Sequence, residues 1–305
     1  MKRLCFLVCL CTIFIFFAGC SNRQEGSENQ NSQIVSSEVS SPEKVAQAKQ
    51  WNEPALLPGL GQIIKKGTLT VAMIKNDVDA FCETLEDGTV TGIDVQWAQS
   101  IADSLGVTLI INRDCDTYDK LTEYLINGNA DLAISTYSPT TERAAYVNLS
   151  KSYLTSRLGV MVNKQELVKK QIENNPIDYM KNNNIKLAAL KNSSHVKLIS
   201  EMFPNAEIVE MDTYEQICQA VRNNDVFGYL CGEVEFLFDY NHDPELALYT
   251  KVFAFSDAAE YYCVGVSPSN NDLLKFVNAL IDSSKVTTIK DVEDKCNEKF
   301  NGEGV

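Results

Sequence analysis

From Thr68 onward the hydrophobic positions follow two alternating patterns, short β-rich runs and stretches with the spacing of an amphipathic helix. Residues 68–74 (TLTVAMI) predict a strand. After Gly92, apolar residues recur every three or four positions, which predicts a helix with Asp94 as its N-cap and Gly106 just past its end. Further elements are predicted at residues 107–112 (strand), 118–127 (helix) and 131–134 (strand). This order is typical of a mainly parallel sheet with a ligand crevice beyond the carboxyl ends of its strands.

The same alternation is repeated further along the chain. Its predicted elements are strands at 158–163, 186–190, 226–231 and 261–266, a short extended segment at 208–210, and helices at 193–203, 214–222 and 272–282. Two similar units predict an α/β fold of two lobes, each a mainly parallel sheet flanked by helices. We expect residues 59–158 with 264–305 to form lobe 1 and residues 159–263 to form lobe 2. Two crossing segments, near 156–159 and 261–265, would be the hinge, and the cleft between the lobes would be the ligand site.

Residues 1–19 are predicted to be a signal peptide rather than part of the fold. Lys2 and Arg3 precede an apolar run at 4–17, which is too short to span a bilayer comfortably and leads into small residues. The segment Phe17-Ala18-Gly19-Cys20 resembles the lipobox of bacterial lipoproteins, in which the cysteine is diacylated. A plain signal peptide cut nearby and an uncleaved anchor are the alternatives.

Residues 20–58 are predicted to form a lipidated flexible tether. Positions 21–50 are rich in Ser, Asn, Gln and Glu and poor in the aromatic and branched apolar side chains that drive ordering. Lipidation of Cys20 would hold the folded part at the extracytoplasmic face of the cell membrane.

Composition narrows the classes of function. The 305 residues are 45% hydrophobic and 22% charged, which is ordinary for a globular protein and excludes a wholly disordered chain. The formal net charge of −14 argues against a nucleic-acid partner, which needs clustered Lys and Arg. With 2 histidines in the chain, no histidine metal site and no cofactor is expected. Asp114, Asp116 and Asp119 lack the glycine and terminal glutamate of a calcium loop and are predicted to form a solvated turn.

The cysteines beyond Cys20 do not form a recognisable motif. They are Cys82, Cys115, Cys218, Cys231, Cys263 and Cys296. They are far apart, with no CxxC pair and no histidine at ligand spacing, which argues against a zinc site. Disulfides and free buried thiols both remain open.

The sharpest local signal lies at residues 131–153. A buried strand ends there, and polar Ser135, Thr136 and Ser138 follow it at the predicted crevice, before a short helical turn that carries Arg143. With the segments around it, this stretch resembles the family 3 extracellular solute-binding proteins, the amino-acid receptors of ABC importers. The matching pieces are Gly92-Ile93-Asp94-Val95, Ile101-Ala102-Asp103-Ser104-Leu105-Gly106, Gly128-Asn129-Ala130-Asp131-Leu132-Ala133, Thr141-Glu142-Arg143 and Leu149-Ser150-Lys151-Ser152-Tyr153. The likeness extends from about Gly67 to residues 299–302 and implies a periplasmic-binding-protein-like (type II) fold.

The resemblance also implies roles for residues of the first lobe. Arg143 would grip the ligand α-carboxylate, because a planar guanidinium makes a bidentate, charge-assisted pair with it. Ser138 would add hydroxyl and backbone contacts, and the carbonyl of Thr136 would accept from the ligand amine. The alternative for Arg143 is a surface ion pair with Glu142 or another neighbour.

In the second lobe, Lys191-Asn192-Ser193-Ser194 stands where family members have a turn that opens a helix. Exposed N–H groups and the helix dipole favour an anion at such a position, so Ser193 and Ser194 are expected to meet the same carboxylate. Ser193 could equally cap the helix, and both roles are compatible. His195 is interpreted as structural.

The partner of the ligand amine is where the sequence departs from the family. Family members usually place an aspartate five residues after the position of Asp225, and here that residue is Leu230. Glu233, Asp77 and Asp79 are the candidates to replace it. Phe81 is the candidate for the aromatic side chain that often covers the ligand.

Taken together, the sequence predicts an extracellular substrate-binding lipoprotein of an ABC importer, which captures an amino acid or related small carboxylate by hinge closure. Its partners would be the ligand, an ABC permease and, through the lipid, the membrane, and the protein would be a monomer. No catalytic residues are expected, because no nucleophile–base pair or GxSxG motif occurs. A sensory ligand-binding module and a dehydratase-like enzyme on the same fold are the alternatives.

Overall fold

The computed structural model describes residues 56–78, 81–172, 176–284 and 291, all of which belong to the unit Ser41–Val305. The predictions of a signal peptide at 1–19 and of lipidation at Cys20 lie outside these residues. So do almost all of the predicted tether, Asp79 and Cys296.

The first group of strands is parallel. β1 (Thr68–Ile74) lies between β4 (Thr108–Cys115) and β5 (Leu132–Ala133) and runs parallel to both. The helices of this part are α2 (Pro58–Lys66), α3 (Ile93–Leu105), α4 (Tyr118–Ile126), α5 (Thr141–Ala144) and α12 (Asn271–Ser283). A small hairpin of β2 (Glu83–Thr84) and β3 (Val90–Thr91) precedes α3.

The second group repeats this arrangement. β7 (Lys186–Leu190) pairs in parallel with both β8 (Glu207–Met211) and β9 (Gly228–Gly232). Its helices are α6 (Lys164–Lys169), α7 (Pro176–Asn182), α8 (Ser194–Met202), α9 (Tyr214–Asn223), α10 (Glu233–His242) and α11 (Leu246–Tyr249).

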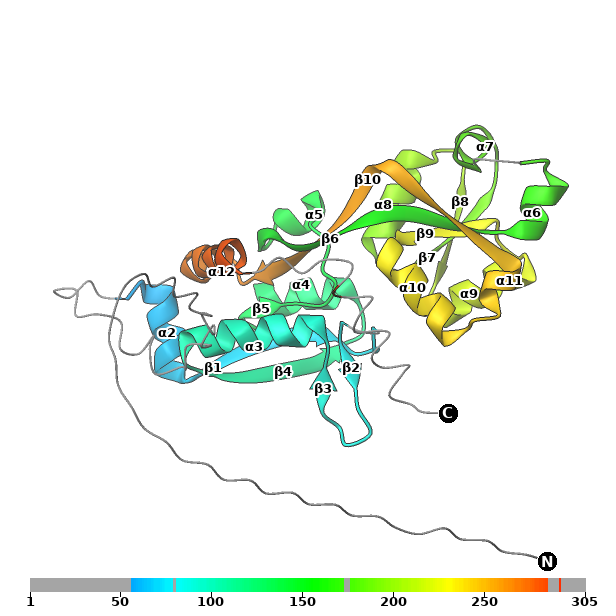
Figure 1. Cartoon of the computed structure of the whole chain (residues 1–305). Helices are drawn as coiled ribbons and strands as arrows, with labels where there is room; N and C mark the ends of the chain where they lie inside the picture. The colour runs from blue at the N-terminus through cyan, green and yellow to red at the C-terminus, as the bar shows by residue number, and fades with distance from the viewer. Residues whose placement is uncertain (1–55, 79–80, 173–175, 285–290, 292–305) are drawn as a thin grey trace, which may run out of the picture. The chain divides into compact units, whose positions relative to one another are not determined.

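Two long antiparallel strands join the groups. β6 (Asn148–Asn163) and β10 (Thr250–Val266) run side by side from one group to the other (Figure 1). β10 pairs with β5 and β6 pairs with β9, which gives the strand order β4-β1-β5-β10-β6-β9-β7-β8. The fold is therefore two-lobed α/β with mainly parallel lobes and two crossing segments, as predicted.

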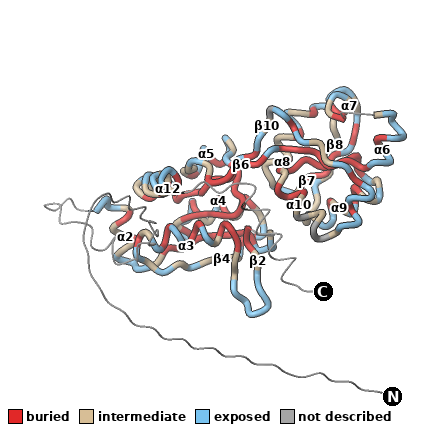
Figure 2. The backbone as a smooth tube through the Cα atoms, viewed as in Figure 1, coloured by how far each residue is buried: buried red, intermediate tan, exposed pale blue. Residues whose placement is uncertain are grey.

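The hydrophobic cores follow the same division. Along β6, Leu154 belongs to the core around β1 and α3, whereas Leu158 belongs to the core around β7 and α8. Along β10, the change falls between Phe255 and Tyr262. Buried backbone follows the strands of both groups in Figure 2. The lobe boundaries stay a prediction, and Tyr262 of predicted lobe 2 packs in the core of the first group.

The start of α3 differs from the prediction. Gly92, not Asp94, is the N-cap residue, with a φ of 127°, and an added Cβ would collide with the backbone of Phe81. Asp94 lies in the first turn of the helix and is fully buried. Its carboxylate accepts hydrogen bonds from the Thr136 backbone N–H and the Tyr153 hydroxyl, both far away in the sequence. Asp94 therefore links α3 to the end of β5.

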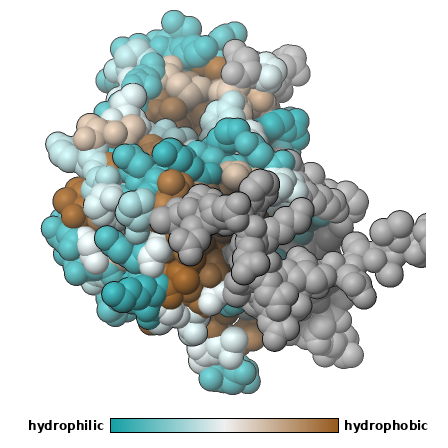
Figure 3. Space-filling view, turned by 90° about the vertical axis from the view of Figure 1, so that its left-hand side faces the viewer, coloured by the Kyte–Doolittle hydropathy of each residue, from teal (hydrophilic) through white to brown (hydrophobic). Residues whose placement is uncertain are grey.

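The described cysteines are all free thiols, namely Cys82, Cys115, Cys218, Cys231 and Cys263. None of the helices in the described ranges has the length and hydrophobicity that a membrane span requires. On the face in Figure 3 hydrophilic residues predominate, and the hydrophobic ones gather in a few patches.

Candidate functional site

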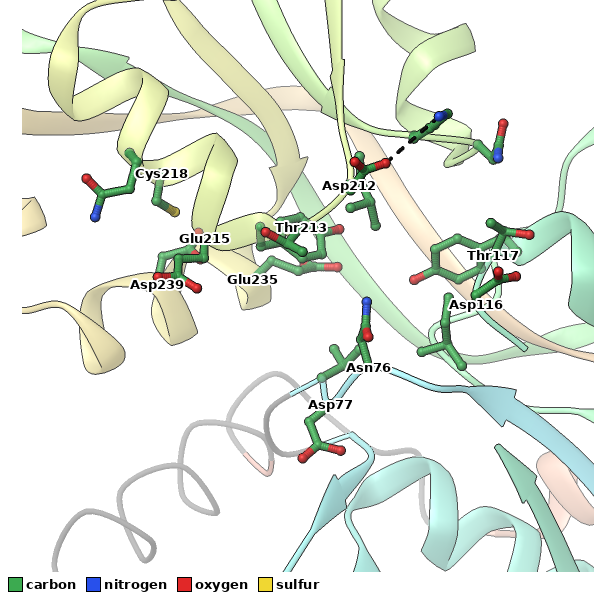
Figure 4. Close-up of a pocket in the computed structure, with 18 of the residues that line it drawn as sticks. Asn76, Asp77, Asp116, Thr117, Asp212, Thr213, Glu215, Cys218, Glu235 and Asp239 are labelled. Atoms are coloured by element: carbon green, nitrogen blue, oxygen red, sulfur yellow. Dashed lines mark ion pairs between the residues drawn. The ribbon is translucent and has the colours of Figure 1, made fainter. Parts of the chain in front are cut away.

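A cavity of about 1030 Å³ lies at the carboxyl ends of four parallel strands. Asn76 and Asp77 follow β1, Thr117 follows β4, Lys191 follows β7 and Asp212 follows β8. Figure 4 shows these loops, together with α10, converging on one space. The location is the crevice that a parallel sheet presents to ligands.

The loops after β4 and β8 carry the same tripeptide. Asp116-Thr117-Tyr118 and Asp212-Thr213-Tyr214 each follow the edge strand of their group, and all six residues line the cavity. Thr117 and Thr213 are the N-caps of α4 and α9, and each side chain accepts a backbone N–H at 3.2 Å. The repeat therefore places one carboxyl and one phenol ring from each lobe at the cavity.

The lining is acidic. Its carboxyl groups are Asp77, Asp116, Asp212, Glu215, Glu235, Asp239 and Asp243, and Lys191 is the basic residue among the lining residues described. Some of these charges are compensated from outside the lining, Asp77 by Arg113 at 2.7 Å and Asp243 by Arg222. The solvated turn predicted around Asp116 is exposed, and it also forms one side of the cavity.

Arg143 is not itself among the residues that line this cavity, but it packs against Tyr118, which is. It is 7% exposed, and its Cζ lies 4.4 Å from the ring centroid of Tyr137 and 5.3 Å from that of Tyr118. Its Nη1 donates to the carbonyl of Ser138 at 2.7 Å. No ion pair of Arg143 occurs among the described residues, and Glu142, the alternative partner, pairs with Lys197. A buried guanidinium without a carboxylate is suited to bind an anion.

Ser138 and Ser194 meet although they belong to different lobes. Ser194 opens α8, and its hydroxyl donates to the hydroxyl of Ser138 at 3.1 Å. Ser193 is the N-cap residue, but its side chain makes no capping bond, and its buried hydroxyl has no partner. An unpartnered hydroxyl and free N–H groups at the start of a nine-residue helix favour an anionic ligand.

Thr136 adopts a left-handed backbone conformation, with a φ of 44°. Such a conformation is strained for a β-branched residue, and the buried carboxylate of Asp94 holds it by accepting its N–H at 2.8 Å. Its hydroxyl is hydrogen-bonded to that of Tyr118 at 3.0 Å. Burial raises the pKa of Asp94 to about 7, although the hydrogen bonds from Tyr153 and Thr136 lower it.

Two buried glutamates lie beside the Ser138–Ser194 contact. Glu260 on β10 accepts from Ser138 at 3.2 Å and contacts Nε2 of His195 at 3.0 Å. Glu235 on α10 accepts from the Tyr262 hydroxyl at 2.7 Å through Oε1, whereas its Oε2 is buried and has no partner.

The two carboxyl groups differ in their electrostatics. Burial and then the charge of Glu260 raise the pKa of Glu235 to about 7. Burial would also raise the pKa of Glu260, but His195 and the hydroxyl donors outweigh it, so that this pKa lies below 4.5. Glu260 is therefore charged near neutral pH, whereas Glu235 is present there in both its protonated and its charged form.

The three remaining candidates lie in different places. Asp77 lines the cavity; burial acts to raise its pKa, but hydrogen bonds from Arg113 and Thr84 lower it. Phe81 is fully buried in the core and tilts against Tyr262, with ring centroids 5.7 Å apart. Glu233 accepts from Nε of Arg157 at 2.9 Å. Among the candidate residues that the structure describes, Asp77 is the one that lines the cavity; Arg143, Ser138 and Ser194 form a cluster beside it, and Phe81 and Glu233 lie elsewhere.

Sequence reasoning missed Tyr118, Tyr214 and Glu235 as lining residues. The two tyrosines had a readable signal, the repeated Asp-Thr-Tyr after two predicted strands. Glu235 had none: a helix was expected to start near Glu233, but no pattern in the sequence indicates which of its side chains faces the cavity. No cluster of three or more potential metal ligands occurs among the described residues.

A two-lobed α/β fold with a polar cavity at the strand ends, and beside it a buried arginine that forms no ion pair with the described residues, is suited to bind a small solute. The chain belongs to the bacterial extracellular solute-binding proteins, family 3, whose sequence profile matches residues 69–298. The resemblance found in the sequence is thereby confirmed.

Curated relatives include the glutamate-binding protein GluB of Corynebacterium efficiens, which is 24% identical over 233 residues, or 73% of this chain and 76% of GluB. Among solved structures, the amino acid ABC transporter substrate-binding protein AbpA of Streptococcus pneumoniae, bound to L-arginine, matches with a TM-score of 0.63 at 22% identity, over 77% of this chain and 98% of AbpA. The ancestral amino acid-binding protein AncCDT-1, a precursor of cyclohexadienyl dehydratase, matches with a TM-score of 0.61 at 23% identity, over 79% and 97%.

Proposed function

We propose that this protein is the substrate-binding component of an ABC importer and captures an α-amino acid or a related small carboxylate in the cavity. The observation that carries the proposal is the meeting of Arg143, Ser138 and Ser194. Ser138 and Arg143 belong to one segment and Ser194 to another, 56 residues from Ser138, and each suits a carboxylate, by hydroxyl, by charge or by its place at a helix start.

The ligand carboxylate would replace the direct bond between the two serine hydroxyls. Arg143 would offer the N–H groups that Ser138 does not use, and the unpartnered Ser193 hydroxyl would complete the site. The carbonyl of Thr136, whose left-handed conformation Asp94 holds, would accept from the ligand amine. Binding of one ligand by groups of both lobes would favour the closed arrangement of the lobes.

The hinge in this proposal is the pair of long strands. Lobe 1 would comprise 59–158 with 264–305, and lobe 2 would comprise 159–263, so that β6 and β10 alone bend between them. The closed form would be recognised by a permease. The protein would act without catalysis, as a monomer anchored through Cys20 at the extracytoplasmic face of the membrane. Family membership supports the extracellular receptor role.

Titration calorimetry of the full chain against the common amino acids and small dicarboxylates tests the proposal. We expect saturable binding of at least one of these compounds, with one ligand per chain. Deletion of the gene separates import from a sensory role. If the protein serves import, uptake of that compound should be lost; if it is a sensor, uptake should persist and a signalling response should be lost. Absence of binding across the whole panel would overturn the proposal.

A further inference from the structure

The charge of the cavity lining is informative about the ligand. Seven carboxyl groups and one lysine line it; the lysine, Lys191, lies 3.9 Å from Asp212, and Asp116, Glu215 and Glu235 take part in no ion pair among the described residues. A ligand with an anionic side chain would meet like charges there and would lose its hydration without gaining a cationic partner. The lining favours positive charge.

A second observation is independent of this charge. Glu235 is 6% exposed, lines the cavity, and leaves Oε2 without any hydrogen-bond partner. In Figure 4 its side chain extends toward the space that Asn76 and Thr117 face from the other side. A buried carboxylate oxygen without a donor is costly, and a cationic donor from a ligand would satisfy it.

The repeated tripeptides supply the third observation. Figure 4 shows Asp212 and Thr213 on one side of the cavity and Asp116 and Thr117 on the other. Each aspartate is followed, two positions later, by a tyrosine that also lines the cavity. Carboxylates and phenol rings are the side chains that bind ammonium and guanidinium groups, through ion pairs and cation–π contacts.

We propose that the cavity selects an α-amino acid with a cationic side chain, whose α-ammonium group pairs with Glu235 and whose side-chain cation lies between Asp116 and Asp212. The inference rests on the proposed function, because it uses Arg143 and Ser138 to place the ligand carboxylate.

The carboxylate and ammonium sites of this arrangement lie near each other. Glu260 accepts a hydrogen bond from Ser138, which belongs to the carboxylate site. Oε2 of Glu260 also lies near Oε2 of Glu235, because a Cβ added to Gly232 would be 2.9 Å from the Glu260 oxygen and 2.5 Å from the Glu235 oxygen. The carboxylate and ammonium sites are therefore adjacent. The side chain of the ligand would extend away from them, toward the two tripeptides.

Calorimetry with the full chain and matched ligands tests the inference. The probes are L-arginine, L-lysine, L-glutamate and L-citrulline, which is a neutral compound with nearly the shape of arginine. We expect arginine or lysine to bind at least about tenfold more tightly than citrulline, and glutamate not to bind. Equal or tighter binding of citrulline or glutamate would overturn the inference and leave the proposed function intact. Binding of no amino acid at all would overturn both.

Two isosteric variants separate the two cationic sites. Asp116→Asn should weaken the binding of arginine about tenfold and leave the affinity for citrulline unchanged. Glu235→Gln should weaken the binding of both ligands by the same factor. Asp225→Asn, an exposed carboxylate of the same unit outside the cavity lining, is the control for net charge and should change neither. Thermal unfolding of the free variants checks that each one folds. Unchanged affinities in folded Glu235→Gln or folded Asp116→Asn would contradict the assigned positions.

Discussion

The hydroxyl of Ser194 donates a hydrogen bond to the hydroxyl of Ser138 over 3.1 Å, and the contact joins positions 56 residues apart. Ser138 follows β5 in the first group of strands, and Ser194 begins α8 in the second. Arg143 donates to the carbonyl of the same Ser138. One small anion at this junction could therefore contact both halves of the fold at once, which is what coupling of binding to lobe closure requires.

Substitution of Arg143 should abolish binding without unfolding the protein. Arg143→Ala removes a charge-assisted pair whose bonds contribute roughly 1.5–3 kcal/mol each, so affinity should fall by about 100-fold or more. Arg143→Lys keeps the charge but loses the planar guanidinium with its paired N–H donors, so it should still weaken binding about tenfold. Arg157→Ala, which removes an exposed guanidinium paired with Glu233, is the control. Calorimetry that finds full affinity in Arg143→Ala would refute the carboxylate site.

Asp94 should matter more through its hydrogen bonds than through its charge. Asp94→Ala leaves the Thr136 N–H and the Tyr153 hydroxyl without a partner inside the protein, so unfolding should be easier by about 2–4 kcal/mol. In Asp94→Asn the amide oxygen can accept from Thr136 and the amide nitrogen can donate to Tyr153, so the loss should be much smaller.

The pH dependence provides a second check on Asp94. Its pKa is raised to about 7 from 3.8, so the folded protein binds a proton that the unfolded chain has released between these values. The contribution of this group to stability is fully present below about pH 4 and is lost as the pH rises through about 7. Denaturant titrations should show a decline relative to Asp94→Asn across this range, and parallel curves would contradict the raised pKa.

The sequence predicted much of the fold because most elements have a clear period. The bounds of β1 and β7 agree with the prediction residue for residue. The long strands were only half predicted, since β6 begins ten residues before its apolar run at 158, and β10 begins at Thr250. Their missing halves mix apolar residues with polar ones, some of which are buried, such as Ser156 and Glu260, so they lack the uniform apolar run of a buried strand.

The site was predictable to the extent that local segments carry it. Arg143, Ser138 and Ser194 belong to short motifs and do come together. Asp94 was expected to cap its helix. It is buried instead, and its burial is explained by a tertiary contact with Thr136 that the local sequence does not reveal. The position of Glu235 depends on how α10 packs against Tyr262 on β10, and no local pattern encodes that contact.

The buried pair of His195 and Glu260 should be a large contributor to stability near neutral pH. Burial alone would lower the pKa of His195, but Glu260 and Glu235 raise it above 6.5. The contribution of His195 is fully present below pH 6.5 and is lost as the pH rises through its raised pKa. The contribution of Glu260, whose pKa is lowered, is present above pH 4.5 and is lost as the pH falls through that lowered pKa.

Glu260→Gln should therefore destabilise the protein by about 3 kcal/mol, because it leaves a buried imidazolium without its counter-charge. Chemical denaturation between pH 5 and about pH 8 measures this loss, which should be largest in the middle of the range. Arg157→Gln breaks an exposed pair and should cost less than about 1 kcal/mol. A loss for Glu260→Gln no larger than that of this control would show that the buried pair contributes little.

Lipidation can be tested without reference to the ligand. Cys20→Ser should move the protein from the membrane fraction to the soluble fraction, because the acyl chains would have no thiol to attach to. Cys11→Ser, in the same apolar segment, should leave the protein with the membrane. Retention of Cys20→Ser in the membrane fraction would mean that another anchor holds the protein.

The affinity for a cationic ligand should depend on the ionisation of Glu235. Burial and the charge of Glu260 raise its pKa to about 7 in the free protein, whereas a bound ammonium group would favour the charged form. The titratable groups that face it are Glu260 and Tyr262 on β10, His195 on α8, Tyr214 on α9, Cys231 on β9 and Tyr118 on α4. Burial raises the pKa of each of these tyrosines and of Cys231, so they stay neutral near pH 7.

Below about pH 7, binding must first displace a proton from Glu235, so affinity should fall about tenfold between pH 8 and about pH 6. Calorimetry in two buffers of different ionisation enthalpy should detect proton release near pH 7. The pKa of His195 is also raised by its glutamate neighbours, and Glu235→Gln separates the two groups because it keeps His195 and removes only the glutamate. The pH profile of this variant should be nearly flat. If the profile is as steep as that of the unmodified protein, the displaced proton belongs to His195. That result would contradict the binding of the ammonium group by Glu235.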